Sequence, residues 1–313
     1  MRDASRRVAD PTFIAVDWGT SNARFTLVDG DGKSIAERSA PGISRLAGPE
    51  AIESACFETI QGWISPSSPL PVVMSGMVGS SLGWRVVPYL ACPATVESIV
   101  GACERFSCRG VQFVIVPGVS TRRADGFPDA MRGEETQILI RLGVEPGQYC
   151  LPGTHSKWAH TANRAIAGFH TALTGELLEL LGLHSVLLSP RRAPRAIVDE
   201  AYLAGVNASR HASMGLESLL FTVRSQQTVS TMKSSEAESY LGGLCIGFDV
   251  RSALTQFDRS QSVTLVGAAP IAALYAAAAE HYDWHTSTID GQEAALGGLA
   301  LIHAALFEGR NVL

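Results

Sequence analysis

The sequence predicts an α/β protein built from two similar halves, each with a mixed β-sheet and helices packed on it. Three observations predict this fold. The order strand, glycine turn, strand occurs twice, in FIAVDWGTSNARFTLVDG near the start and in YCLPGTHSKWAH from residue 149. Helical segments follow both openings, so strands and helices are mixed in each half. The 313-residue length suits two domains, which we expect at residues 1-145 and 146-313.

The first half opens with antiparallel strands. Residues 13–29 are expected to form two strands around a tight turn, and the hairpin sequence DGDG leads into a third strand. A helix over residues 49–63, the strand PVVMSG, a helix near residues 94–106 and the strand VQFVIVPG follow. These elements favour a mixed sheet covered by helices.

The second half repeats this architecture rather than its letters. RAIAGFHTALTGELLELLGL predicts a strand followed by a helix. Later segments are mostly helical, including residues 234–251 and 270–280, with one clear strand, SVTLVG, between them. The chain closes on the helix QEAALGGLALIHAALFEG, which is free to pack back on the first domain.

Composition narrows the class of protein. With 25 basic and 30 acidic residues the net charge is -5, which disfavours a broad attraction to nucleic acid. The six cysteines include no C-x-x-C pair and have no histidine at zinc-site spacing. The start has no apolar leader, and the apolar runs are too short to span a membrane. We therefore expect a cytoplasmic protein whose chemistry depends on local groups.

The first candidate site is the turn DWGTSN, in which a carboxylate ends an apolar strand and small, hydroxylated residues follow. Backbone N–H groups and hydroxyls in such a turn can hold phosphate oxygens. Asp17 can hold Mg²⁺ through water, because Mg²⁺ keeps much of its hydration shell in proteins. A plain hairpin that ends in an aspartate is the competing interpretation.

The second candidate site is the turn LPGTHSKW, which offers the same residue types and adds Lys157 to neutralise phosphate charge. A histidine and a lysine in a loop are often no more than solvent-exposed side chains, so this turn matters when it is paired with the first. Two similar halves that face each other across a cleft would bring the two glycine turns together. That geometry suits a polyphosphate.

Between the turns, residues 131–143 have the pattern of an amphipathic helix whose end is marked by Gly143. Glu134 and Glu135 lie near its start, where acids complement the helix macrodipole. Each is also a candidate general base with a raised pKa beside a sugar hydroxyl. Other nucleotide motifs are missing, since Leu27 replaces the first glycine of a P-loop and no G-x-G-x-x-G follows a strand.

The chain resembles the 2-keto-3-deoxygalactonokinase family from about residue 13 to residue 306. The resemblance is carried in order by VDWGTSNARFTLVDG, VVMSGMVGSSLGWRVVPYL, MRGEETQIL, LPGTHSKW, FHTALTGELLELLGLHSVL and VTLVGAAPIAALYAAA. It implies an α/β fold of two actin/hexokinase-like (ribonuclease H-like) domains, with a mixed sheet in each and an active-site cleft between them. It also implies ATP and Mg²⁺ as cosubstrates and 6-phosphorylation of 2-dehydro-3-deoxy-D-galactonate.

Carried over by motif, the resemblance gives both turns a role. DWGTSN is similar to the first phosphate loop of the actin-like ATPase superfamily, with Asp17 as a catalytic residue near the metal and with Gly19, Thr20, Ser21 and Asn22 near the phosphates. PGTHSKW is similar to the second phosphate loop, whose cofactor-binding residues would be Gly153, Thr154, His155, Ser156 and Lys157. The usual acid at its head is replaced by Leu151-Pro152, which leaves Asp17 as the sole loop-borne metal carboxylate.

The same resemblance supplies the remaining candidates. The GEE segment is similar to the acidic connecting helix of exopolyphosphatases, which favours Glu134 or Glu135 for proton handling, with a slight preference for Glu134. Gly267 and Ala268 are placed like an adenosine-binding turn, although a simple helix entry would have the same sequence. The substrate-binding residues would be Ser75, Gly76, Met77, Trp84, Arg85 and Arg132. Of these, Arg85 could meet a carboxylate bidentately or be a solvated loop residue.

The sequence thus predicts a cytoplasmic sugar-acid kinase whose partner is a small-molecule sugar acid, with no nucleic-acid or membrane partner. It leaves the assembly open between a monomer and a homodimer. One rival is an exopolyphosphatase-like phosphohydrolase that uses water in place of the sugar. The other is a non-catalytic sugar sensor on the same scaffold, for which no helix-turn-helix or basic segment is evident. ATP turnover that depends on a sugar acid would decide for the kinase.

Overall fold

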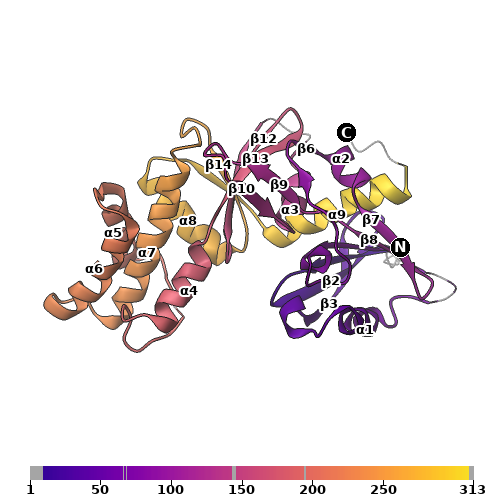
Figure 1. The fold of residues 1–313 in the computed structure, drawn as a ribbon, viewed down its shortest axis with the longest axis horizontal. Coiled ribbons are helices and arrows are strands. Elements are labelled where there is room, and N and C mark those ends of the chain that lie inside the picture. The colour runs from indigo at the N-terminus through magenta and orange to yellow at the C-terminus, as the bar shows by residue number, and fades with distance from the viewer. Residues whose placement is uncertain (1–9, 66, 68, 143–145, 194, 310–313) are drawn as a thin grey trace, which may run out of the picture. The chain divides into compact units, whose positions relative to one another are not determined.

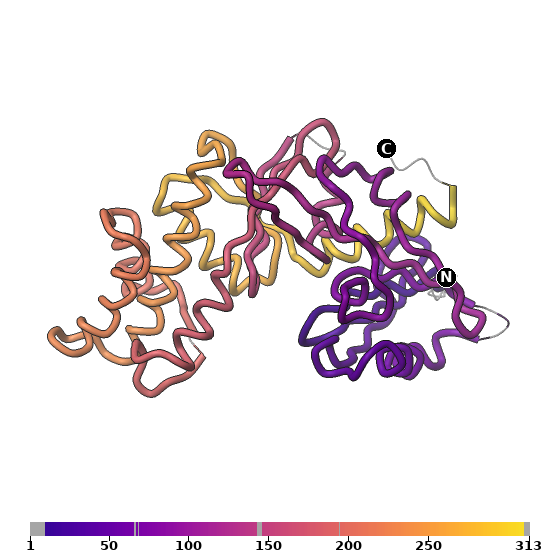
Figure 2. The backbone as a smooth tube through the Cα atoms, in the orientation of Figure 1, coloured from indigo at the N-terminus to yellow at the C-terminus, as the bar shows by residue number. Residues whose placement is uncertain are grey.

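The computed structural model describes residues 10–65, 67, 69–142, 146–193 and 195–309. Contacts between Cα atoms divide the chain into two compact units. Unit 1 comprises Met1–Glu145, Ala162–Gly168 and Glu293–Leu313, and unit 2 comprises Pro146–Thr161 and Phe169–Gln292. Figure 2 traces the chain through both units from indigo to yellow. Unit 1 therefore takes its residues from three separate stretches of the sequence.

A six-stranded mixed sheet forms the centre of unit 1. Its order is β3-β2-β1-β4-β8-β7, with β1 (Pro11–Trp18), β2 (Asn22–Asp29), β3 (Ser34–Pro41), β4 (Val72–Gly76), β7 (Glu104–Cys108) and β8 (Val111–Ile115). Strands β1, β2 and β3 are antiparallel, whereas β1, β4 and β8 run parallel. The predicted antiparallel opening and the hairpin between β2 and β3 are confirmed. Helix α1 (Pro49–Ile60) ends three residues before the predicted end at residue 63.

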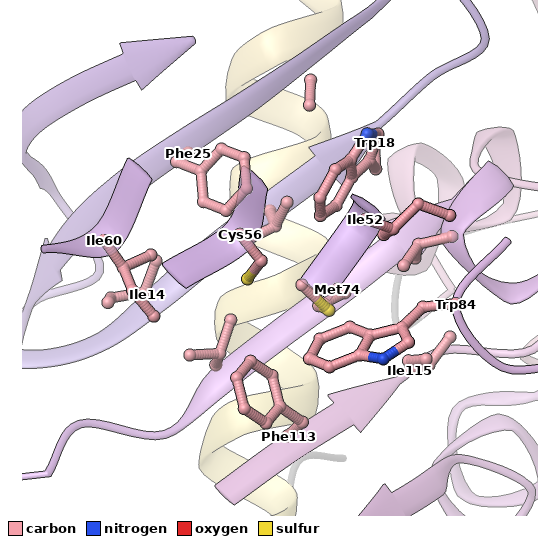
Figure 3. Packing of buried hydrophobic residues seen from close by; sticks show 14 of the residues in the cluster. Ile14, Trp18, Phe25, Ile52, Cys56, Ile60, Met74, Trp84, Phe113 and Ile115 are labelled. Carbon is pink, nitrogen blue, oxygen red and sulfur yellow. The ribbon is translucent and has the colours of Figure 1, made fainter. Parts of the chain in front are cut away.

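Strand β1 is covered on both faces, which explains its nearly continuous apolar sequence. Figure 3 shows Ile14 and Trp18 packed with Phe25, Met74 and other buried side chains of one core. Phe13 points to the opposite face, because successive side chains of a strand alternate. There its ring stacks on His303 of α9 (Gly291–Phe307) at 4.3 Å. This packing fixes the carboxyl end of β1, where Asp17 lies.

A smaller sheet in unit 1 has the order β10-β9-β5 and consists of β5 (Leu90–Ala91), β9 (Val119–Arg122) and β10 (Pro128–Met131). Helix α3 (Glu134–Leu139) follows β10 directly. The helix predicted over residues 131–143 is therefore shorter than expected. Met131 pairs with Val119 in the sheet, and Gly133 has a φ of 110°, so helical geometry starts only at Glu134. Gly143, its predicted end, lies outside the described residues.

The helix predicted near residues 94–106 is largely wrong. This stretch contains β6 (Ala94–Thr95), the six-residue helix α2 (Val96–Gly101) and the start of β7. Thr95 caps α2 by accepting a hydrogen bond from the Ser98 backbone N–H, in a capping box. Residues 104–108 alternate between half-buried and exposed positions, which is the two-residue period of a strand.

The sheet of unit 2 contains three parallel strands, β11 (Gln148–Leu151), β14 (Val263–Val266) and β15 (Thr286–Ile289). The order is β15-β14-β11-β12-β13, with β12 (Ser156–Ala162) antiparallel to β11 and with β13 (Ala165–Ala172) next to it. Residues 162–168 of β12 and β13 belong to unit 1, where Ala165 and Ile166 pair with β6. The repeated strand, turn, strand pattern is confirmed. Strand β15 was not predicted, because its sequence TSTI has no apolar alternation.

Helices make up the rest of unit 2, as predicted. They are α4 (Thr174–His184), α5 (Glu200–His211), α6 (Leu216–Val229), α7 (Ser234–Ala253) and α8 (Ala269–His281). The long helix α7 is buried over most of its length and packs against α4, α5, α6 and α8 (Figure 1). Among the described residues, no helix combines the length and apolarity needed to cross a membrane.

Candidate active site

Asp17 lies near the carboxyl end of β1, in a position set by the sheet register. The parallel pairing of β1 with β4 places it beside Ser75, and the antiparallel pairing with β2 places it opposite Arg24. Its side chain is half-buried. Burial raises the pKa of Asp17, the positive charge of Arg24 opposes this shift, and the negative charge of Glu134 adds to it. The two acids Asp17 and Glu134 are thus close enough to interact electrostatically.

The turn after β1 has its carbonyl oxygens bonded within the protein. Backbone N–H groups of residues 42–44 donate to the carbonyl oxygens of residues 19–21 at 3.1–3.2 Å. The Gly19 N–H closes the turn onto the Asn22 carbonyl at 2.9 Å. Carbonyl oxygens that would repel a phosphate are therefore occupied, while Thr20, Ser21 and Asn22 remain exposed.

Helix α3 brings its two glutamates to the end of β4. A Cβ added at Gly133, the residue before the helix, would be 3.4 Å from the Gly76 Cα atom. Glu134 is half-buried and accepts a hydrogen bond from the Arg132 backbone N–H at 3.1 Å. Glu135 is completely buried and accepts one from the Gly133 N–H at 2.7 Å. Burial, followed by the charge of Glu134, raises the pKa of Glu135 to about 8.

Several buried polar atoms near this helix have no hydrogen-bond partner among the described residues. They are the Ser75 Oγ, the Glu135 Oε1, and the Nε and Nη1 of Arg132. Arg132 otherwise donates from Nη2 to the Val87 carbonyl at 2.7 Å, and its guanidinium lies over the Tyr89 ring. An unsatisfied buried polar group costs on the order of 1–3 kcal/mol, so a group of them calls for an explanation such as a polar ligand.

Other predicted pocket residues have partners within unit 1. Arg85 lies over the Phe106 ring, and its Nη1 is 3.6 Å from a carboxylate oxygen of Glu104. Trp84 belongs to the buried core of Figure 3, and Met77 is partly buried against that core. The structure thus brings Ser75, Gly76 and Arg132 near the two glutamates and holds Arg85 and Trp84 against Phe106. Their contact with a sugar acid stays a prediction.

In the second turn, between β11 and β12, some of the predicted phosphate-binding residues are exposed and others are buried. Gly153, Thr154 and His155 are exposed, whereas Ser156 and Lys157 are buried at the start of β12. The Lys157 ammonium donates a hydrogen bond to the His155 carbonyl at 3.2 Å. A positive charge therefore lies beneath the turn rather than in solvent, where it can act on an anion held by the backbone above it.

The N-terminus of α4 packs directly on this turn. A Cβ added at Gly175 would be 2.3 Å from the Gly153 carbonyl oxygen, and the Glu176 N–H donates to the Thr154 carbonyl at 2.9 Å. The Glu176 side chain also reaches His155, with 2.5 Å between Oε2 and Nε2. The first turn of a helix carries partial positive charge, which favours anions nearby.

The predicted adenosine turn lies beside the second turn in unit 2. A Cβ added at Gly267 would be 3.6 Å from the Pro152 side chain, and one added at Gly291 would be 3.1 Å from the Gly267 Cα atom. Helix α8 begins two residues after Gly267, and helix α9 begins at Gly291. Ala268 is exposed. These groups gather at the carboxyl ends of the parallel strands β11, β14 and β15, where open α/β sheets bind ligands.

Comparison with known proteins decides the family. The model of the family described as 2-keto-3-deoxy-galactonokinase matches residues 17–302. The chain belongs to this family. A 2-dehydro-3-deoxygalactonokinase of Escherichia coli (strain K12) is 33% identical over 294 residues, which cover 93% of this chain and 98% of that protein. A probable 2-dehydro-3-deoxygalactonokinase of Rhizobium meliloti (strain 1021) is 32% identical over 305 residues, with coverages of 94% and 97%.

Solved structures agree with this membership of the 2-keto-3-deoxy-galactonokinase family. A crystal structure of a Sinorhizobium meliloti protein, provisionally assigned as a 2-dehydro-3-deoxygalactonokinase, has a TM-score of 0.87 and 31% identity and covers 94% of this chain and 99% of its own. A provisionally assigned N-acetylglucosamine kinase of Porphyromonas gingivalis has a TM-score of 0.50 at 14% identity, with coverages of 94% and 99%, and shows the fold alone. The predicted family, the actin/hexokinase-like fold class and the kinase activity are confirmed.

Some residues of the candidate site were not foreseen in the sequence. Gly175 and Gly291 allow helices to begin against the second turn and the adenosine turn. Glu176, which the sequence offers only as an alternative carboxylate for proton handling, bonds to His155. Their only local indication is that each follows a strand and begins a helix, which is also common outside binding sites. Asp249 in the middle of α7 has no local indication, because its partners are far away in sequence.

Proposed function

We propose that this protein transfers the γ-phosphoryl group of Mg-ATP to the 6-hydroxyl of 2-dehydro-3-deoxy-D-galactonate. The observation that carries the proposal is the match, at 32–33% identity over more than nine-tenths of the chain, to two proteins named for this sugar acid. The two glycine turns support it, because both expose small residues. In the first turn the carbonyl oxygens are already bonded within the protein, and the second turn has the Lys157 ammonium beneath it and the start of α4 packed on it. We infer a cytoplasmic location, where ATP is supplied, and leave a homodimer to be tested by light scattering.

We assign ATP mainly to groups of unit 2. The exposed backbone of Gly153, Thr154 and His155 would hold phosphate oxygens, with the Lys157 ammonium beneath the turn offsetting their charge. Gly267 and Ala268 would lie along the adenosine. A side chain larger than hydrogen at Gly267 would narrow that approach from the side of Pro152. In unit 1, Gly19, Thr20, Ser21 and Asn22 would contact phosphate as well.

The donor set near Asp17 fits Mg²⁺. Burial raises the pKa of Asp17, and the charge of Glu134 raises it further, so a divalent cation near both acids would relieve their mutual repulsion. Among the described residues, no group of three or more histidines, cysteines and acids could form a protein-only metal site. Mg²⁺ needs no such group, because one or two carboxylates, water and phosphate oxygens complete its shell. When bound, the ion would neutralise charge on the transferring phosphoryl group.

We assign proton handling to Glu134. A primary hydroxyl does not ionise near neutral pH, so a carboxylate placed beside it should accept its proton as the phosphoryl group is transferred. Glu134 is half-buried, and its charge acts on Asp17. Glu135 is completely buried with a pKa of about 8, so it holds its proton at neutral pH. Phosphoryl transfer depends mainly on the positioning of the reacting groups, and the start of α3 would position the sugar hydroxyl.

We assign the carboxylate of the sugar acid to Arg132, with Ser75 nearby. Two of the guanidinium nitrogens of Arg132 have no partner among the described residues, which matches the bidentate geometry of a carboxylate. Arg85 remains a second proposed contact, although Glu104 and Phe106 already engage its guanidinium. Trp84, Met77 and Gly76 would shape the pocket from the core side.

A coupled ADP-release assay over a panel of 2-keto-3-deoxy sugar acids and plain hexoses tests the proposal. We expect turnover that requires 2-dehydro-3-deoxy-D-galactonate and Mg²⁺, with phosphorus NMR placing the phosphate on C6. ADP release that is equally fast without any acceptor would support a phosphohydrolase. Sugar binding without ADP release would support a sensor, and turnover with hexoses alone would overturn the assignment of the substrate.

A further inference from the structure

A fully bonded carboxylate is buried behind the second turn in unit 2. Asp249 of α7 accepts hydrogen bonds from the Trp158 Nε1 at 2.8 Å, from the Thr174 hydroxyl at 2.7 Å and from the Tyr275 hydroxyl at 2.7 Å. Asp249 is 5% exposed, and its three partners are also buried. The Tyr275 hydroxyl also bonds to the Ser156 hydroxyl at 2.7 Å. We call these five residues the Asp249 network.

Chemistry fixes the direction of its hydrogen bonds. The Tyr275 hydroxyl donates its single proton to Asp249, so its oxygen accepts the hydrogen bond from the Ser156 hydroxyl. The Ser156 proton is thus directed inward and does not serve a phosphate. Burial raises the pKa of Asp249, and the three donors oppose that shift. Removal of any of these donors would leave part of the carboxylate uncompensated.

The Asp249 network holds the second turn through hydrogen bonds on both of its sides. Ser156 directly follows the exposed residues Gly153–His155, so its bond to Tyr275 fixes one end of the turn on α8. Thr174 directly precedes Gly175 and Glu176, which pack on the Gly153 and Thr154 carbonyls. One carboxylate therefore holds the strand that leaves the turn and the helix that begins against it.

We propose that Asp249 is a positioning residue for the phosphate-binding turn, acting through Tyr275 and Ser156 on one side and through Thr174 on the other. The proposal rests on the assignment of this turn to ATP phosphates. Backbone N–H groups bind an anion well only when their spacing is preset, because reordering them on binding reduces the affinity. The network therefore controls nucleotide affinity without touching the nucleotide.

The core offers a matched control for this role. Tyr202 and Tyr275 are both buried in the same hydrophobic cluster, and each donates one strong hydrogen bond. Tyr202 donates to the Leu274 carbonyl at 2.6 Å, and among the described residues no hydrogen bond joins its side chain to the turn or to the residues that flank it. Tyr202→Phe and Tyr275→Phe remove the same atom from the same core, and Tyr275→Phe also leaves the Asp249 carboxylate short of one donor, so it should cost more stability. The melting temperature of each variant separates this loss of stability from an effect on ATP affinity.

The experiment measures ATP and sugar-acid dissociation constants by calorimetry and melting temperatures for the wild type, Tyr202→Phe, Tyr275→Phe and Ser156→Ala. We expect Tyr275→Phe to weaken ATP about tenfold and Ser156→Ala to weaken it less, with sugar-acid affinity unchanged. Tyr202→Phe should lower the melting temperature but leave ATP affinity within about twofold. Equal ATP affinities in Tyr275→Phe and Tyr202→Phe, both measured well below their melting temperatures, would overturn the proposal.

Asp249→Asn adds a stricter test. The amide keeps the shape but turns one accepting oxygen into a donor that faces other donors, so ATP affinity should fall further than in Tyr275→Phe. If Asp249→Asn does not fold, the milder Ser156→Ala and Tyr275→Phe variants still decide. ATP binding is measured in the absence of the sugar acid. A wild type that binds ATP but does not phosphorylate the sugar acid would therefore refute the substrate assignment, and the test of Asp249 would still apply.

Discussion

Gly175 packs against the carbonyl oxygen of Gly153 so closely that a Cβ at position 175 would lie 2.3 Å from that oxygen. A carbon–oxygen contact at this distance is severely repulsive. Neither atom can rotate away, because Cβ is bonded to Cα and the oxygen belongs to the backbone. The contact joins the beginning of α4 to the second glycine turn. A side chain at position 175 would therefore change the geometry of the proposed phosphate loop.

We expect Gly175→Ala to weaken ATP about tenfold or more and to destabilise the protein by about 1–3 kcal/mol, because α4 must move off the turn. ATP titration and chemical denaturation measure the two effects. Gly101→Ala is the matched control, since Gly101 also lies in a helix but a Cβ there would meet no atom within 4 Å. The control should be neutral or slightly stabilising. Normal ATP affinity in Gly175→Ala would remove the turn from the nucleotide site.

Asp17→Asn should reduce turnover on the order of a hundredfold while the protein stays folded, because the change keeps the shape and removes the charge that would organise Mg²⁺. Burial and Glu134 already raise the pKa of Asp17, so ionised Asp17 is a cost to folding at neutral pH. The variant should accordingly melt no lower than the wild type. Turnover at limiting and saturating Mg²⁺, with the melting temperature, measures both. Near-normal turnover at limiting Mg²⁺ would contradict the metal role.

Arg132→Lys should raise the Michaelis constant for the sugar acid about tenfold and leave that for ATP unchanged, because an ammonium cannot match a carboxylate bidentately. Arg85→Ala is the comparison. Its guanidinium is half-exposed and already engaged by Glu104 and Phe106, so we expect a weaker effect, of threefold or so. A larger effect at Arg85 than at Arg132 would reverse the assignment of the carboxylate contact.

The sequence was sufficient to predict the parts of the fold that local patterns encode. The apolar run before Asp17 and the small residues after it placed that acid near the end of a strand, which the structure confirms. The repeated strand, turn, strand pattern was found for the same reason. The helix near residues 94–106 was mispredicted because a capped helical turn and an alternating strand stand side by side there.

Tertiary contacts explain what the sequence could not supply. Ser156 and Lys157 look like loop residues beside His155, yet β12 begins at Ser156 and buries both. The reason is the core around them: Trp158 bonds to Asp249, which lies 91 residues further along the chain. No local pattern predicts such a pairing. The difference in burial between Glu134 and Glu135 likewise depends on what packs against each face of α3.

The pKa of Glu135 predicts how stability depends on pH. The unfolded chain releases this proton near 4.5, whereas the folded protein holds it up to a pH of about 8. Between these values the folded state binds more protons, so this group lowers the free energy of unfolding as pH rises. Glu135→Gln mimics the protonated acid and lacks the effect. Its stability relative to the wild type should increase by roughly 3 kcal/mol from pH 5 to pH 8, measured by urea denaturation. Parallel pH profiles would contradict the raised pKa.

The identity of the catalytic carboxylate is tested by separate glutamine substitutions on α3. Adjacent helical positions point about 100° apart, so Glu134 and Glu135 cannot face the same environment. Glu134 is half-buried and its charge acts on Asp17, whereas Glu135 is completely buried. We expect Glu134→Gln to lower turnover between about a hundredfold and ten-thousandfold, with little change in the Michaelis constants, because only the transition state needs the proton acceptor.

Glu135→Gln is the matched control for Glu134→Gln, because it makes the same chemical change one position away in the same helix. A neutral amide replaces an acid that is already protonated near pH 7, so turnover should fall by less than about tenfold. Circular dichroism and melting temperatures must show both variants folded. A severe loss in Glu135→Gln with a mild one in Glu134→Gln would exchange their roles. Two mild losses would exclude both, and the search would move to acids such as Glu176, which holds His155 on the second turn.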